Sequence, residues 1–170
     1  MGMVISGMTA DARILCKFMR NACMNYEYVF GGKHPAERLI SVIGKKSQAK
    51  TCSYSKRPFG VGLLVGAVDK AGTHLYETCP SGNYYEYVSM AIGDKCQSAK
   101  TYLERNFEGF DKLGSEDLIK HGLKALKASA QETELTENNV SVGVVGVGQD
   151  FKMLSKEETR AALASLDGDE

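Results

Sequence analysis

The 170-residue sequence predicts a single α+β domain in which layers of helices pack around antiparallel sheet. Apolar residues recur at helical spacing in some segments and form short alternating or continuous runs in others, which indicates both helices and strands. The strand segments follow one another across tight turns, as antiparallel strands do. The helical segments come in pairs rather than between successive strands, so a doubly wound parallel sheet is not expected.

The N-terminal part predicts one short strand followed by two helices. An apolar run that ends at Gly7 is typical of a buried strand. A helix over 9–26 is expected next, because Thr9 can cap it and apolar residues then recur at helical spacing. These apolar residues are Leu15, Phe18, Met19, Ala22, Cys23 and Tyr26. After a glycine pair, a second helix is expected to open with Pro35, since proline is favoured at the first helical position.

Three antiparallel strands are expected after the helices, over 59–68, 73–79 and 84–92. The first is apolar almost throughout, which is typical of a strand covered on both faces. Tight turns at 69–72 and 80–83 are predicted between them, because these segments contain the Gly, Pro, Asn and Asp residues that turns favour. The three strands are therefore interpreted as a meander.

The second half predicts two helices, then a hairpin, then a last helix. The helices are expected over 95–107 and 115–130, and the strands of the hairpin over 140–147 and 151–154. The last helix is expected to begin after Ser155. Glu158 follows this serine by three residues, which is the spacing of a capping box.

Composition excludes several classes of protein. The 21 Lys plus Arg balance 21 Asp plus Glu, which argues against a nucleic-acid-binding protein. No apolar run approaches 18 residues, so no membrane-spanning helix is expected, and the first residues lack the layout of a signal peptide. The five cysteines show no C-x-x-C spacing and are an odd number, so they are interpreted as reduced thiols rather than disulfides or zinc ligands.

No motif for catalysis, cofactor binding or metal binding emerges from the residues alone. The glycine-rich segments 60–62 and 143–148 lack the Lys-Ser/Thr of a phosphate-binding loop. His34, His74 and His121 show no metal-binding spacing, and no G-x-S-x-G elbow is present. A Cys–His dyad is allowed by the composition, but nothing in the sequence brings these residues together.

Several stretches, in one order along the chain, are similar to a known family. Arg57-Pro58-Phe59-Gly60-Val61-Gly62-Leu63-Leu64 is one, and the others are 9–13, 78–84, 91–93 and 139–146. Together they resemble the α-type subunits of the 20S proteasome core particle, over about residues 3–160. Two further stretches, 97–105 and 120–126, are most similar to the eukaryotic α type-1 subunits.

The resemblance implies the four-layer αββα sandwich of the N-terminal nucleophile hydrolases, truncated at the N-terminus. The family's gating segment, first helix and first strands are expected to be absent before Met1 of this sequence. The implied role is that of a non-catalytic structural subunit of the outer α ring, which controls substrate entry and docks regulators in ubiquitin-dependent and ubiquitin-independent protein degradation. Thr9 lies after a strand at a helix cap, so it does not match the N-terminal threonine nucleophile of catalytic members.

The resemblance also implies partners and surfaces. The expected partners are the other α subunits of a seven-membered ring, the β subunits and regulatory particles, with no nucleic acid, membrane, cofactor or metal, in the cytoplasm and nucleus. Arg13, Lys17 and Arg20 on the polar side of the first helix are expected at the ring interface, and Gly7 and Met8 in the wall of a pocket for regulator tails. The alternative is a stand-alone hydrolase on the same sandwich, with a cysteine nucleophile.

Overall fold

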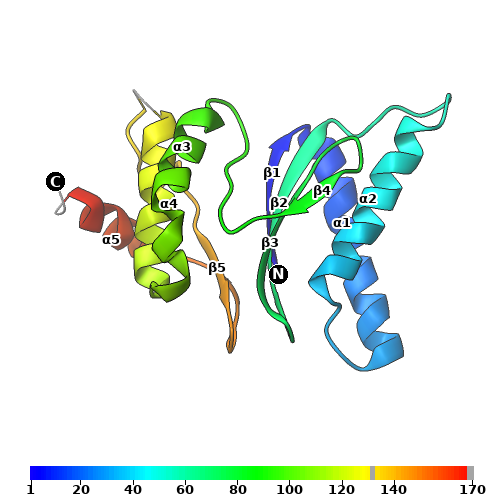
Figure 1. The fold of residues 1–170 in the computed structure, drawn as a ribbon, viewed down its shortest axis with the longest axis horizontal. Helices are drawn as coiled ribbons and strands as arrows, with labels where there is room; N and C mark the ends of the chain where they lie inside the picture. The colour runs from blue at the N-terminus through cyan, green and yellow to red at the C-terminus, as the bar shows by residue number, and fades with distance from the viewer. Residues whose placement is uncertain (131–132, 168–170) are drawn as a thin grey trace. The chain divides into compact units, whose positions relative to one another are not determined.

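A computed structural model describes residues 1–130 and 133–167 of the chain. They form two compact units, Met1–Tyr87 and Val88–Glu170. Each unit combines helices with antiparallel strands, which confirms the predicted α+β class (Figure 1). The expectation that 1–170 form a single domain stays a prediction.

The first unit contains a four-stranded sheet in the order β1-β2-β3-β4, with antiparallel neighbours throughout. Its strands are β1 Gly2–Gly7, β2 Val61–Asp69, β3 Gly72–Thr78 and β4 Tyr84–Glu86. The expectation of a strand over 84–92 was wrong in its length. The ladder ends where the Tyr87 amide donates to the Leu75 carbonyl, because the chain leaves this unit directly afterwards.

Two helices cover one face of this sheet, α1 Thr9–Phe30 and α2 Ala36–Thr51 (Figure 1). Alternate residues of β2 face them and are buried, while the residues between are half-buried. The largest fully buried side chains of the core are Leu15, Leu39, Ile40, Ile43, Leu63 and Val65. This packing of apolar side chains is the main source of stability in such a unit.

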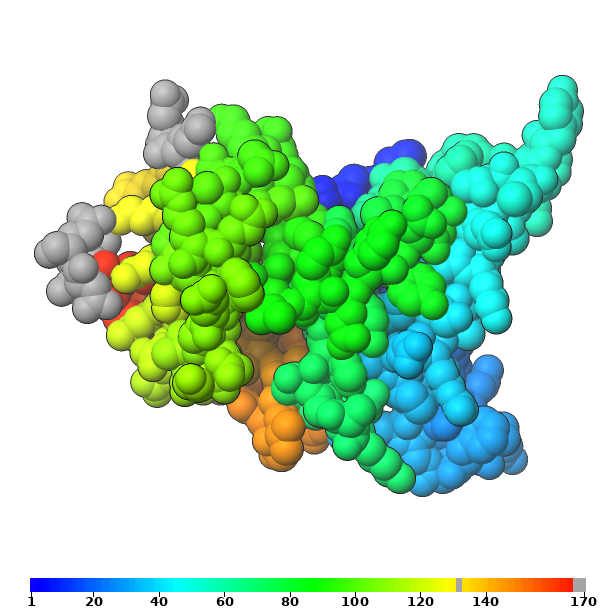
Figure 2. Space-filling model, viewed as in Figure 1, coloured from blue at the N-terminus to red at the C-terminus, as the bar shows by residue number. Residues whose placement is uncertain are grey.

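The boundaries of both helices differ from the expected ones. α1 continues to Phe30, where Gly31 adopts a φ of 65° and its amide donates to the Glu27 carbonyl, a typical helix C-cap. Pro35 caps α2 rather than forming its first residue, because its ψ of 137° is extended. The segment between α2 and β2 projects from the unit (Figure 2), and its Tyr54 side chain is fully exposed.

Over its described residues, 88–130 and 133–167, the second unit contains a two-stranded sheet and three α-helices. The elements are α3 Cys96–Asn106, a 3₁₀ turn Phe107–Lys112, α4 Ser115–Ala130, β5 Gly143–Gly146, β6 Gln149–Met153 and α5 Lys156–Asp167. The hairpin turns at 147–148, and not over 148–150 as expected. Its first strand begins three residues late because Val140 ends a turn, with its amide bonded to the Thr136 carbonyl, and is buried against Leu123 and Leu166.

The predicted capping box at α5 is confirmed. The Glu158 amide donates to the Ser155 hydroxyl at 3.2 Å, and the Ser155 amide donates to the Glu158 carboxylate at 2.7 Å.

In the part of the chain that the structure describes, no helix is both long and apolar enough to cross a membrane.

Candidate functional site

The corner between β1 and α1 joins two distant parts of the sequence. The Met8 amide donates to the Gly60 carbonyl at 2.8 Å, and Gly7 pairs with Val61 at the end of the β1–β2 ladder. The corner therefore brings the predicted pocket residues Gly7 and Met8 against the segment before β2. That segment is the start of the motif 57–64.

Gly7 occupies a place that only glycine fits. Its φ is 121°, a value that side-chain-bearing residues rarely adopt, and an added Cβ would lie 2.3 Å from the Gly60 oxygen. A Cβ at Gly60 would in turn lie 2.7 Å from the Met8 sulfur. The close approach of the backbone at Gly60 explains the glycine at position 7, whereas a Cβ at Gly60 would meet only the flexible Met8 side chain. The Met8 side chain is half-exposed beside them.

A buried carboxylate fixes this corner from inside. Asp11, in the first turn of α1, accepts two hydrogen bonds from the Arg57 guanidinium, at 2.7 and 2.9 Å, and one from the Gly60 amide at 2.9 Å. The Arg57 hydrogen bonds, followed by that of the Gly60 amide, lower the pKa of Asp11 to about 2. This bidentate pair, the Asp11–Arg57 clamp, holds the carboxylate ionised and sets the position of the segment before β2.

Sequence reasoning missed this clamp. Asp11 lies in the motif 9–13 and Arg57 in the motif 57–64, but they are 46 residues apart, and no spacing rule pairs them. The sequence offers only an aspartate in the first turn of a predicted helix and a distant Arg-Pro-Phe-Gly segment, and neither by itself indicates the contact.

Arg13, Lys17 and Arg20 lie on α1 with exposed side chains, as expected. Residues 9–51, which contain both helices of the first unit, carry eight Lys and Arg against three Asp and Glu, although the whole chain is neutral. The helix layer of this unit is therefore basic. The interface role of these three residues stays a prediction.

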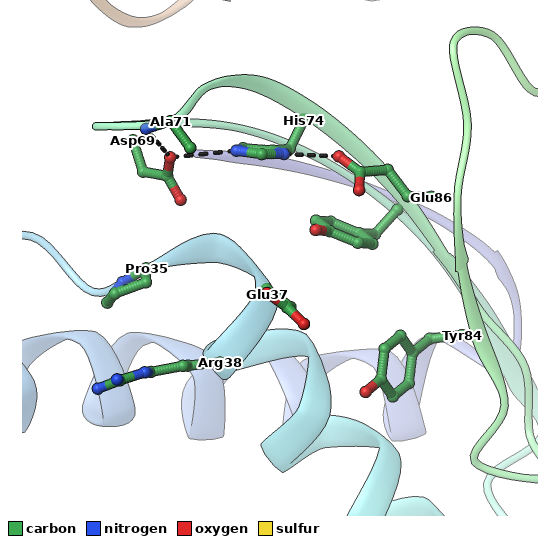
Figure 3. A pocket seen from close by; sticks show the side chains of 9 residues that line it. Pro35, Glu37, Arg38, Asp69, Ala71, His74, Tyr84 and Glu86 are labelled. Carbon is green, nitrogen blue, oxygen red and sulfur yellow. Dashed lines mark hydrogen bonds and ion pairs between the residues drawn. The ribbon is translucent and has the colours of Figure 1, made fainter.

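A pocket of about 520 Å³ lies between the start of α2 and the strands β2, β3 and β4. Figure 3 shows Glu37 of α2 and Tyr84 of β4 on the α2 side of the His74 ring. The residues that line the pocket are Pro35, Glu37, Arg38, Asp69, Ala71, His74, Tyr76, Tyr84 and Glu86. Sequence reasoning identified none of them as a site.

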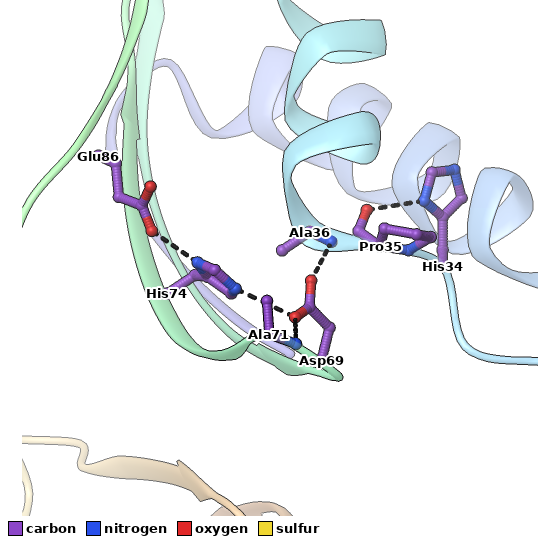
Figure 4. A network of polar contacts seen from close by, with 7 residues as sticks. All are labelled: His34, Pro35, Ala36, Asp69, Ala71, His74 and Glu86. Atoms are coloured by element: carbon purple, nitrogen blue, oxygen red, sulfur yellow. Dashed lines mark hydrogen bonds and ion pairs between the residues drawn. The ribbon is translucent and has the colours of Figure 1, made fainter.

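His74 is held between two carboxylates at this pocket (Figure 4). Its Nε2 lies 3.1 Å from Asp69 Oδ1, and its Nδ1 lies 2.6 Å from Glu86 Oε1. These hydrogen bonds raise the pKa of His74, against the opposing effect of burial. The hydrogen bond with Glu86 has the largest effect. The ring nitrogens are thus engaged by acids and are not directed at a nucleophile.

The other candidate residues do not assemble into a catalytic group. His34 Nδ1 contacts the Pro35 carbonyl at 2.9 Å, and His121 Nδ1 contacts the Tyr102 hydroxyl at 2.9 Å. The five cysteines are free thiols. Within residues 1–130 and 133–167, no group of three or more His, Cys, Asp or Glu side chains could hold a metal ion.

Comparison with known proteins gives consistent matches. The model of the proteasome subunit family matches residues 1–145. The chain is 49% identical to the proteasome subunit alpha type-1 of Dictyostelium discoideum, covering 99% of this chain and 69% of the relative. The alpha type-1 subunits of Trypanosoma brucei rhodesiense and Drosophila melanogaster are 42% and 36% identical, over 95% and 96% of this chain.

The chain spans 69%, 61% and 60% of the lengths of these three relatives. The matches confirm the resemblance to the α type-1 subunits and the expected α+β fold of the N-terminal nucleophile hydrolase type. With a family match over most of its length and three α-type relatives above 30% identity, the chain belongs to the proteasome subunit family.

Proposed function

We propose that this protein is a non-catalytic structural subunit of the outer α ring of the 20S proteasome core particle. There it contributes to substrate-entry control and regulator docking in protein degradation, both ubiquitin-dependent and ubiquitin-independent. The observation that carries the proposal is the 49% identity to an α type-1 subunit over 99% of the chain. The proposed partners are the other α subunits of a seven-membered ring, the β subunits and regulatory particles, in the cytoplasm and nucleus.

The geometry of the candidate nucleophiles supports a role without catalysis. A threonine nucleophile of this fold uses a free terminal amine as its base. Thr9 is instead the first residue of α1 and follows β1, so its nitrogen is part of a peptide bond. The contacts of the three histidines described above are to carbonyl, carboxylate and hydroxyl oxygens, which gives no support to a cysteine nucleophile.

The proposal is tested on the protein at its own genetic locus. The protein carrying an affinity tag added there should sediment with the peptidase-active core particle. Purification through the tag should recover the other α and β subunits. A covalent probe for nucleophiles should label other subunits of that particle and leave the tagged one unlabelled. A tag that stays with free protein, or a stoichiometric label on this chain, would contradict the proposal.

The ring contact is proposed to include the exposed basic residues of α1. Because the helix layer of the first unit carries a surplus of positive charge, it favours an acidic neighbour over a basic one. Arg13, Lys17 and Arg20 are exposed, so they are available for such a contact. Each charge needs an opposite charge if the contact excludes water, since an unpaired buried charge is costly.

Reversing two of these charges tests the contact. Arg13→Glu with Arg20→Glu should lower incorporation into the core particle about tenfold or more, which is the scale for breaking desolvated charge pairs. The melting temperature should stay nearly unchanged because both side chains are exposed. The charge-conserving pair Arg13→Lys with Arg20→Lys should assemble normally. Loss of folding in the reversed variant would instead assign these residues to the subunit's own stability.

Regulator docking is proposed at the corner of Gly7 and Met8. Gly7 is required by the close approach to Gly60, and the Met8 amide is already bonded to the Gly60 carbonyl, so neither fact by itself supports docking. The half-exposed Met8 side chain is the group available to a regulator tail. Met8→Asp should therefore weaken regulator-stimulated peptide entry while leaving particle assembly intact, and normal stimulation would assign the corner to the fold alone.

A further inference from the structure

His74 and the two carboxylates that contact it tie together four elements of the first unit. Asp69 is the last residue of β2, His74 lies in β3 and Glu86 is the last residue of β4. The second oxygen of Asp69 accepts the Ala36 amide, at the start of α2, at 3.1 Å. Its first oxygen also accepts the Ala71 amide of the turn at 2.8 Å (Figure 4).

The geometry requires a particular protonation state of the imidazole. A neutral imidazole carries one N–H donor and one lone pair, whereas the imidazolium donates from both nitrogens. Each nitrogen of His74 faces a carboxylate oxygen within hydrogen-bond distance. Only the protonated ring satisfies both contacts, since a neutral ring would direct a lone pair at one of the two acids.

The surroundings of the ring identify which contact can open. The side chains of His74 and Asp69 are 17% and 16% exposed, while that of Glu86 is 50% exposed. Asp69 is further held by two backbone amides. Glu86 belongs to β4, a strand of only three residues. Glu86 also accepts a hydrogen bond from the Tyr76 hydroxyl, but it is the most exposed of the three residues, so its contact with the ring is the one we expect to open when the ring loses its proton.

Other ionisable groups lie near the ring on the surrounding elements. Tyr76 of β3 stacks on the imidazole at 5.9 Å, and burial, then Glu86, raises its pKa to about 12, so it stays neutral. Glu37 and Arg38 of α2 line the same pocket, as does Tyr84 of β4. Asp69 and Glu86 face the ring from β2 and β4.

We propose that Asp69, His74 and Glu86 form a protonation-dependent clasp, which fastens the short strand β4 to β3 and to the start of α2. Because the folded pKa of His74 is raised above 6.5, the clasp is closed below this value. It opens as the pH rises through the folded pKa. The device makes the order of β4, next to the point where the chain leaves the first unit, depend on pH.

Two measurements test the clasp on the complete chain. With only three histidines, the imidazole carbon signals can be assigned by single substitutions and titrated by NMR. His74 should titrate above 6.5. The Tyr87 amide, which donates to the Leu75 carbonyl at 2.8 Å, reports on β4 by hydrogen exchange. Its protection factor, corrected for the intrinsic pH dependence, should fall about threefold to tenfold as His74 deprotonates.

Variants separate the clasp from general stability. Glu86→Gln keeps the shape of the half-exposed side chain, and should lower the pKa of His74 and remove the pH dependence at Tyr87. His121→Gln, which removes a histidine hydrogen-bonded to a tyrosine, should leave the pH dependence at Tyr87 unchanged. The protection factor of the Leu154 amide, in the second unit, should be the same in every variant. A His74 that titrates at or below 6.5, or a Tyr87 protection factor that responds to pH equally in wild type and Glu86→Gln, would overturn the proposal.

Discussion

Substituting Gly7 by alanine should lower the free energy of unfolding of the first unit. Two separate effects contribute to this loss. The φ of 121° places a side-chain-bearing residue in a sparsely populated region, at about 1–3 kcal/mol. The new Cβ would lie 2.3 Å from the Gly60 oxygen, and relieving such an overlap costs about 1–3 kcal/mol. The expected loss of about 2–6 kcal/mol is a large part of a typical domain's stability.

Gly72→Ala is the matched control for this prediction. Gly72 has a similar φ of 131°, but nothing lies within 4 Å of the position its Cβ would take, so it carries only the backbone cost. Native-state hydrogen exchange of the buried β2 residues Leu63 and Val65 measures the free energy of opening of this unit alone. Equal losses in the two variants would refute the conclusion that the approach of Gly60 makes glycine necessary at the corner.

Two further variants probe the clamp and the capping box. Because the pKa of Asp11 is lowered to about 2 from 3.8, its contribution to stability is present above about pH 4 and lost as the pH falls through 2. Asp11→Asn should therefore flatten the acid side of the stability profile measured by urea unfolding, whereas the exposed Asp117→Asn should not. Ser155→Ala should destabilise α5 by about 1 kcal/mol, measured by amide exchange in that helix. The control is Ser129→Ala of α4, a half-buried serine that starts no helix. An unchanged α5 would mean that its packing alone determines its start.

Elements with local determinants were predictable from the sequence. Ser155 and Glu158 lie within one turn of each other, so the box that starts α5 could be recognised from its spacing and is confirmed. The third strand of the meander was predicted too long, because its pattern continues to Ile92 while the ladder ends beside Tyr87. Where a strand stops is determined by the end of its pairing with a neighbour, which the pattern of one segment does not contain.

The His74 cluster shows why a site is harder to predict than the strands that carry it. His74 reaches Asp69 because the β2–β3 register pairs it with Ala67, two residues before Asp69. It reaches Glu86 because β4 pairs Glu86 with Tyr76, two residues along β3 on the same face. A slip of one residue in either ladder would move a carboxylate to the opposite face. The pattern of alternation predicts the strands, whereas two registers, each determined by a turn and by core packing, decide whether three ordinary side chains become one network.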